Sequence, residues 1–122
     1  MKDSSIEKGA TGERLAKKFL IDKGFEIIHC NWFCRWGEID IIARDGDVLV
    51  FVEVKSVASD SFGRPEEWVD ERKQRHIIKA TMQYMMDNSY NDVPVRFDVV
   101  TVDLRKRKCH YISDAFVYEE KS

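Results

Sequence analysis

The sequence predicts an α/β sandwich with a mixed central sheet flanked by helices, in the order helix, three strands, helix, two strands. Two segments, 11–24 and 65–86, carry apolar residues at helical spacing, whereas the runs between and after them have the length and composition of strands. The last two strands are expected over 95–102 and 109–118, on either side of a basic turn. The 122 residues, without internal repeats, suit a single domain, 1–122, with one hydrophobic core.

The first helix is expected to begin near Thr11, whose hydroxyl can cap it, and to end at Gly24, a residue type favoured just past a helix. Residues 1–8 are polar and are expected to be frayed. A first strand is expected over 25–30, and residues 31–36 lead from it into the next strand. One face of the helix is apolar and is formed by Leu15, Ala16, Phe19 and Leu20.

The second helix is expected to begin at Pro65 or Asp70 and to run to about Met86. The segment 57–65 before it is small, polar and interrupted by glycine and proline, so a mobile loop is expected there. The helix has an apolar stripe that consists of Ile77, Ile78, Thr81, Met82 and Met85. The methionines of this stretch, Met86 included, are interpreted as core filling.

The second and third strands, GEIDIIA and VLVFVEVK, are separated by RDGD, a sequence typical of a hairpin turn. If the chain reverses through Asp45-Gly46 as a two-residue turn, Glu38 lies opposite Glu53. In the same register Asp40 lies opposite Phe51. Because side chains alternate along a strand, one face of the sheet then carries three acids and one lysine. These residues are Glu38, Asp40, Glu53 and Lys55.

Such a face can simply be solvated, and that is the alternative interpretation. Two observations favour a metal site instead. Glutamates that face each other across a ladder repel by a few tenths to about 1 kcal/mol unless a cation lies between them. The third strand is also apolar on both faces before its glutamate, and charges at the end of a buried strand need partners.

Ligands made only of carboxylate oxygens suit a hard cation, above all Mg²⁺ or Mn²⁺. The sequence offers Asp40 and Glu53 as ligands, with Glu38 as a third. Lys55, two residues after Glu53, is placed to orient a water or to neutralise charge that develops on a phosphate. This equipment fits metal-assisted hydrolysis of phosphodiester bonds, whereas no serine triad, phosphate-binding glycine loop or dinucleotide fingerprint occurs.

Composition excludes some other classes. No apolar run approaches the length of a membrane span, and no secretory segment is present, so a cytoplasmic protein that does not enter membranes is expected. The net charge of −2 argues mildly against an indiscriminate nucleic-acid binder. An odd number of cysteines favours free thiols over disulfides; these are Cys30, Cys34 and Cys109. A zinc site that adds His29 or His110 is the less favoured alternative.

Several motifs carry a family resemblance. They are G-x-x-G-E-x-x-A (Gly9 to Ala16), N-x(5)-G-E-I-D (Asn31 to Asp40), F-V-E-V-K (Phe51 to Lys55), K-Q-R (Lys73 to Arg75) and R-F-D-V-V (Arg96 to Val100). Together they resemble the bacterial YraN-type family, which is regarded as predicted endonucleases of the restriction-endonuclease-like, PD-(D/E)XK superfamily. The chain is also similar to archaeal Holliday junction resolvases.

The resemblance implies a restriction-endonuclease-like αβββαββ sandwich and a Mg²⁺- or Mn²⁺-dependent DNA endonuclease, selective for branched or single-stranded DNA. It gives Asp40, Glu53 and Lys55 the metal-binding and catalytic positions. It adds Glu13, which from spacing alone is a first-turn residue that interacts with the helix dipole, and Gln74 of the second helix. Isoleucine precedes Asp40 where the superfamily's name has proline, a usual variation, and Ser-Val follows Lys55 where the family tends to carry a threonine and then an arginine.

The expected partner is DNA, and its phosphates are expected to contact Arg35, Lys73 and Arg75, with Lys17 and Lys18 as the next choice. The aromatic residues beside Arg35 can stack on bases, although core packing is favoured for at least two of Trp32, Phe33 and Trp36. A homodimer is expected by analogy with junction-cleaving relatives. Two alternatives stay open: a binding module that retains the nuclease fold without turnover, and an assembly piece whose last strand pairs with another copy.

Overall fold

The structure is a computed structural model that describes residues 4–57 and 69–116, with side chains described from residue 10 onward in the first helix. The elements occur in the predicted order of one helix, three strands, a second helix and two strands. They are α1 (Ser4–Asp22), β1 (Glu26–Cys34), β2 (Gly37–Asp45), β3 (Val48–Val57), α2 (Glu71–Asp87), β4 (Val95–Asp103) and β5 (Lys108–Phe116).

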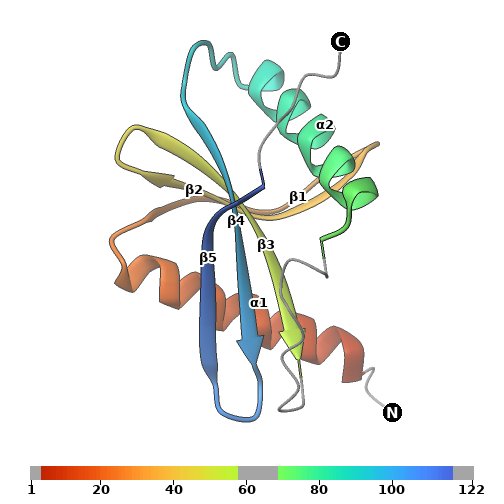
Figure 1. Ribbon diagram of the computed structural model, residues 1–122, viewed down its shortest axis with the longest axis vertical. Helices are drawn as coiled ribbons and strands as arrows, with labels where there is room; N and C mark the ends of the chain where they lie inside the picture. The colour runs from red at the N-terminus through yellow and green to blue at the C-terminus, as the bar shows by residue number, and fades with distance from the viewer. Residues whose placement is uncertain (1–3, 58–68, 117–122) are drawn as a thin grey trace.

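The strands form one five-stranded sheet in the spatial order β1-β2-β3-β4-β5. The β3–β4 pair is parallel and the other three pairs are antiparallel. A parallel pair needs a crossover connection, and α2 lies in the chain between β3 and β4 as that crossover. Figure 1 shows α1 and α2 on opposite sides of the sheet. The prediction of an α/β protein with a mixed sheet and two helices is confirmed.

Each helix buries its apolar stripe against one face of the sheet. On the α1 side, Ala16 and Leu20 pack among buried sheet residues that include Ile41, Ala43, Val50, Val52, Val100 and Val102. On the α2 side, Ile77, Ala80 and Tyr84 pack among residues that include Ile42, Leu49, Phe51, Phe97 and Val99. Because β3 and β4 contribute to both clusters, they are buried on both faces, as their continuous apolar sequences predict.

The first helix is longer at its start than the sequence indicates. It begins at Ser4, so the expected start and cap at Thr11 are wrong. The residues before Thr11 include strong helix formers such as Glu7 and Ala10, which offset the cost of Gly9. The expected end is confirmed: Gly24, with φ of +95°, follows the helix by two residues.

The second helix begins at Glu71, and its N-cap is Asp70, one of the two predicted starts. The Asp70 carboxylate accepts a hydrogen bond from the backbone N–H of Lys73 at 2.9 Å. Most of the expected mobile loop, and Pro65 with it, lies outside the described residues. The interpretation of the methionines as core filling is wrong for two of them, since Met82 is 52% and Met86 75% exposed. Tyr84 takes the inward position instead.

No helix among the described residues is long and apolar enough to cross a membrane. The three cysteines are free and half-buried, as expected for thiols without disulfide partners.

Candidate functional site

The hairpin between β2 and β3 turns one residue later than the sequence predicts. Asp45 pairs with Val48, so the two-residue loop is Gly46-Asp47 rather than Asp45-Gly46. Gly46 has a φ of +61° and holds the first central position of the turn, where type II′ hairpins favour glycine. The pairing of the two strands is therefore shifted by two residues.

This shift overturns both predicted pairings of acidic residues. Phe51 lies opposite Ile42 rather than Asp40. Glu38 pairs with β1 rather than with Glu53. Glu38 and Glu53 therefore do not face each other across the ladder, and the repulsion that helped to predict a cation does not arise from such a pair.

Asp40 lies where the pairing of β2 with β3 stops. The ladder ends at Ile41 and Val52, and the Asp40 carboxylate accepts a hydrogen bond from the backbone N–H of Val54 at 2.8 Å. Ile39 packs in the α2-side core whereas Ile41 packs in the α1-side core, so the alternation of side chains along β2 is interrupted at Asp40. The prediction of one shared acidic face is therefore wrong in detail, and the acids meet at this gap between the strands.

Three carboxylates come together at the gap, and we call them the acid cluster: Glu13, Glu38 and Asp40. One carboxylate oxygen from each lies within 4.8 Å of the other two. Glu13 comes from α1 and the other two come from β2. The cluster thus joins two of the predicted metal and catalytic residues of β2 to the helix residue that only the family resemblance had raised.

The electrostatics of the acid cluster show an excess of negative charge. Burial, followed by the charge of Glu53, raises the pKa of Asp40 to about 8, although the hydrogen bond from Val54 opposes the shift. Burial, Glu13 and Glu53 also raise the pKa of Glu38. Carboxylates whose charged forms are disfavoured in this way are stabilised by a bound cation.

Glu53 adjoins the acid cluster but has a partner of its own. Its side chain is 10% exposed and forms an ion pair with Lys73 of α2, through Oε1 and Nζ. Burial lowers the pKa of Lys73, but the bond to Glu53 and the negative charges of Glu53 and Asp40 outweigh this effect and leave it raised. Lys73, which the sequence suggested as a phosphate contact, thus neutralises a predicted metal ligand.

The other two catalytic candidates, Lys55 and Gln74, do not belong to the acid cluster. Lys55 is exposed, and it follows Glu53 by two residues on β3, opposite Thr101 of β4. The Gln74 side chain donates a hydrogen bond from Nε2 to the backbone carbonyl of Val69 at 2.8 Å. This contact gives Gln74 a structural role at the start of α2.

Two further DNA-contact candidates have protein partners. The Arg35 guanidinium lies 4.4 Å from the centre of the Trp36 ring, and Lys79 Nζ lies 4.5 Å from the same centre. Arg75 pairs with Glu71 at 3.8 Å on the exposed surface of α2. Two of the three aromatics beside Arg35 pack against the core, as favoured; the exposed one is Phe33.

The sequence reasoning did not explain why glycine precedes Glu13. A Cβ atom at Gly12 would lie 1.7 Å from Oγ and 3.0 Å from Cβ of Ser56, so glycine allows α1 to approach the end of β3. This close approach is what brings Glu13 to the acid cluster. The G-x-x-G-E motif was the available signal, because glycine inside a helix has an energetic cost that needs a packing reason.

We therefore expect Gly12→Ala to displace α1 from β3 and to destabilise the protein by about 1–3 kcal/mol, measured by denaturant unfolding. Ser56→Gly should be nearly neutral in the Gly12→Ala background or partly restore stability, because it removes both clashing atoms. Gly24→Ala is the contrasting control, since no neighbour lies within 4 Å of its added Cβ and only the positive φ is strained. Additive effects of Gly12→Ala and Ser56→Gly would contradict the proposed contact.

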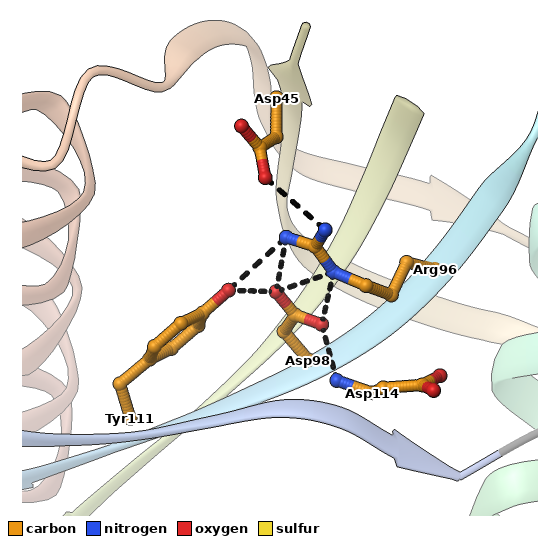
Figure 2. Close-up of polar contacts among 5 residues, drawn as sticks. All are labelled: Asp45, Arg96, Asp98, Tyr111 and Asp114. Carbon is orange, nitrogen blue, oxygen red and sulfur yellow. Dashed lines mark hydrogen bonds and ion pairs between the residues drawn. The ribbon is translucent and has the colours of Figure 1, made fainter. Parts of the chain in front are cut away.

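A second feature that the sequence reasoning missed is a buried polar network, drawn in Figure 2. Asp98 is fully buried and accepts hydrogen bonds from Arg96 (Nε to Oδ1, 3.0 Å), from the hydroxyl of Tyr111 and from the backbone N–H of Asp114 (2.8 Å). Arg96 also reaches Asp45 of the β2–β3 hairpin, at 3.1 Å. The network thus links the hairpin, β4 and β5. The R-F-D-V-V motif was its only sequence signal.

Comparison with known proteins places the chain in a family. Residues 12–102 match the family described as uncharacterised protein family UPF0102. The chain belongs to the UPF0102 family. It is 44% identical over 114 residues to a UPF0102 protein of Syntrophus aciditrophicus (strain SB), with 92% of this chain and 90% of the relative covered. A UPF0102 protein of Clostridioides difficile (strain 630) is 42% identical over 110 residues, with 90% and 96% covered.

The UPF0102 match contains every residue of the acid cluster, the Glu53–Lys73 pair and most of the buried network; only Tyr111 and Asp114 lie beyond residue 102. The matched UPF0102 relatives have almost the same length, since the chain covers 90% or more of each of these two.

Proposed function

We propose that this UPF0102 protein is a metal-dependent endonuclease that hydrolyses phosphodiester bonds of DNA, with branched or single-stranded DNA as its substrate. The observation that carries the proposal is the acid cluster, in which three carboxylates converge within 4.8 Å at the gap between β2 and β3. The order of the elements and the resemblance to restriction-endonuclease-like proteins support it. The resemblance gives Asp40 and Glu53 the metal-binding positions of that superfamily.

The residues present fit a divalent cation. Glu13, Glu38 and Asp40 can supply oxygen ligands, and burial together with the charge of Glu53 raises the pKa of Asp40, so a bound cation would favour its charged form. When bound, Mg²⁺ or Mn²⁺ would polarise a phosphate and lower the pKa of a water. The hydrogen bond from Val54 orients the Asp40 carboxylate for this role. Glu53 extends the same negative site.

Two lysines complete the proposed site. Lys73 holds Glu53 in place through its ion pair and offsets part of the cluster's negative charge. Lys55 is exposed at the end of β3, two residues beyond Glu53, where its ammonium can attract a phosphate from solvent. In the proposed site the carboxylates would hold the cation that binds the substrate phosphate, and the Lys55 ammonium would attract the phosphate's negative charge.

The decisive experiment is a cleavage panel of duplex, flap, fork, four-way junction and single-stranded DNA, with Mn²⁺ or Mg²⁺ and with EDTA. Asp40→Asn, Glu53→Gln and Lys55→Ala should each lose activity, whereas Glu26→Gln and Asp47→Asn should retain it, because these two exposed acids lie outside the acid cluster. Undiminished cleavage in the three site variants would overturn the proposal.

A second candidate is a DNA- or protein-binding module that retains this fold without turnover. The Glu53–Lys73 ion pair favours it, because the pair neutralises one acid of the site without a metal. This candidate requires partner binding that persists in EDTA, with no cleavage of any DNA in the panel when Mn²⁺ is present.

Lys73→Gln separates these two candidates through metal binding. In the metal-free protein this substitution should destabilise the fold by about 1–2 kcal/mol, because the nearly buried Glu53 loses its partner. Added Mn²⁺ should then raise the unfolding temperature more in Lys73→Gln than in the wild type, since one positive charge no longer opposes the cation. Arg72→Gln, an exposed neighbour on α2, is the control. If Mn²⁺ raised the unfolding temperature equally in Lys73→Gln and in the wild type, a cation beside Glu53 would be contradicted.

A further inference from the structure

We infer that a groove between α1 and the β1–β2 strands binds the unpaired strand of a nucleic acid next to the acid cluster. This inference rests on the proposed nuclease function and names the path that the substrate takes away from the site. It follows from the shape, the charge and the apolar floor of one cavity.

The groove has a volume of about 430 Å³, which is within the usual range for ligand pockets. One wall is α1, whose lining residues run from Ala10 through Glu13 to Ile21. The facing wall includes Cys30 and Ile41, which pair across β1 and β2. Because Glu13 belongs both to this groove and to the acid cluster, the groove opens directly beside the proposed cleavage site.

The α1 wall is basic. Arg14, Lys17 and Lys18 line the groove, and Glu13 is the only acid among its lining residues in the described part of the chain. The helical rise places Lys17 about 6 Å along the axis from Glu13. All three basic residues are exposed, and Lys18 forms an ion pair with Asp22 at 3.0 Å. Basic side chains this close to a site that cleaves one phosphodiester bond can bind the neighbouring phosphates of the same strand.

The floor of the groove is apolar. Ile21 is 51% exposed here, although most residues of its type are buried, and the buried Ile41 of the sheet also lines the groove. A base can cover such a surface only when its face is free, as in an unpaired strand, because the faces of bases in a duplex are stacked on one another. Asn31, which also lines the groove, is exposed and holds a left-handed backbone with φ of +53°, and its amide can bond a base edge. An acidic peptide would match the basic wall but not this floor.

The test is binding of a fluorescent single-stranded oligothymidylate, followed by anisotropy in EDTA so that no cleavage occurs. Lys17→Gln should weaken binding of the oligonucleotide. The ratio of its dissociation constant to that of the wild type should grow about fivefold when the salt concentration falls from 1 M to 0.1 M, because one phosphate contact is lost. Lys23→Gln is the matched control: it removes one lysine just past the same helix, where Lys23 stacks on Phe19 outside the groove. It should show a smaller effect.

A second measurement tests the floor. Ile21→Ala should weaken binding of oligothymidylate several-fold, by analogy with base-stacking contacts, and should leave binding of an abasic strand of equal length unchanged. Unfolding temperatures close to the wild type would show that the variants are folded, as expected for exposed positions. If polyglutamate of equal charge competes as well as the oligonucleotide, the groove binds acidic chains in general and the inference is overturned.

The outcomes also separate the groove from the proposed function. If the protein cleaves DNA but Lys17→Gln and Lys23→Gln weaken binding equally, the groove is overturned and the nuclease proposal stands. If it binds single strands through the groove but cleaves none, the nuclease proposal fails and the groove stands as a binding site. If the wild type binds no single strand, the groove is overturned.

Discussion

Asp40→Asn should make the metal-free protein more stable even though it should abolish the proposed DNA cleavage. Burial and Glu53 raise the pKa of Asp40 from its ordinary value of 3.8 to about 8. Between these two values the folded protein holds a proton that the unfolded chain has released, so the stability of the wild type falls as the pH rises. Asparagine has no such proton to lose, and its side-chain oxygen can still accept the hydrogen bond from Val54.

The advantage of Asp40→Asn should be smallest below pH 4, should grow up to about pH 8 and should then stay constant. On the scale of this shift it reaches several kcal/mol, and denaturant unfolding in EDTA across this pH range measures it. Asp47→Asn, an exposed acid in the neighbouring turn, should follow the wild-type pH profile. Saturating Mn²⁺ should stabilise the wild type more than Asp40→Asn. An Asp40→Asn variant less stable than the wild type at pH 8 in EDTA would contradict this account.

Asp98→Ala should cause the largest loss of stability, about 3–5 kcal/mol, because it leaves the Arg96 guanidinium without its buried partner. Asp98 is fully buried and Arg96 is 20% exposed, so water replaces little of the lost interaction. The same carboxylate is the main cause of the raised pKa of Arg96. The measurement is equilibrium unfolding at neutral pH, and the Asp98 variant should also lose the order of β5, which this carboxylate ties to β4.

Three companion variants test this explanation of the Asp98→Ala loss. Tyr111→Phe removes one hydrogen bond to Asp98 and should cost about 1–2 kcal/mol. Asp114→Asn should have little effect, because Asp114 contributes its backbone N–H to the network and its side chain is exposed. Arg96→Met combined with Asp98→Ala should recover part of the loss, since the remaining Asp45 is 44% exposed and no unpaired buried charge is left. A loss below 1 kcal/mol in Asp98→Ala would show that the network contributes little.

The acid cluster and the Arg96 network have opposite effects on the stability of the fold. The acid cluster gathers carboxylates whose charges repel, and Asp40→Asn should relieve that cost. The Arg96 network, by contrast, fixes the hairpin that carries Asp40 through its contact with Asp45. A cluster of like charges persists where surrounding structure holds it, and a cation bound as proposed above would offset its cost.

The sequence by itself determined the order of the elements, because apolar periodicity follows directly from which faces are buried. It also pointed to Glu38 and Asp40, since acids within apolar strands require partners, whereas Glu13 entered only through the family resemblance and Glu53 lies beside the acid cluster, paired with Lys73. It did not determine the register of the β2–β3 hairpin: the RDGD sequence allows two turns, and only the packing of the whole sheet decides that Gly46 leads the loop.

The tertiary structure alone decided the remaining features, because each depends on contacts between residues distant in the chain. Lys73 reaches Glu53 from a helix on one side of the sheet, and Gly12 lets Glu13 approach from a helix on the other side. Side chains on surface helices look alike in a sequence whether they face solvent or a buried acid. The partner of each charge is fixed only when the helices pack. That packing brings Glu13 and Lys73 to acids that the sequence had only placed along two strands.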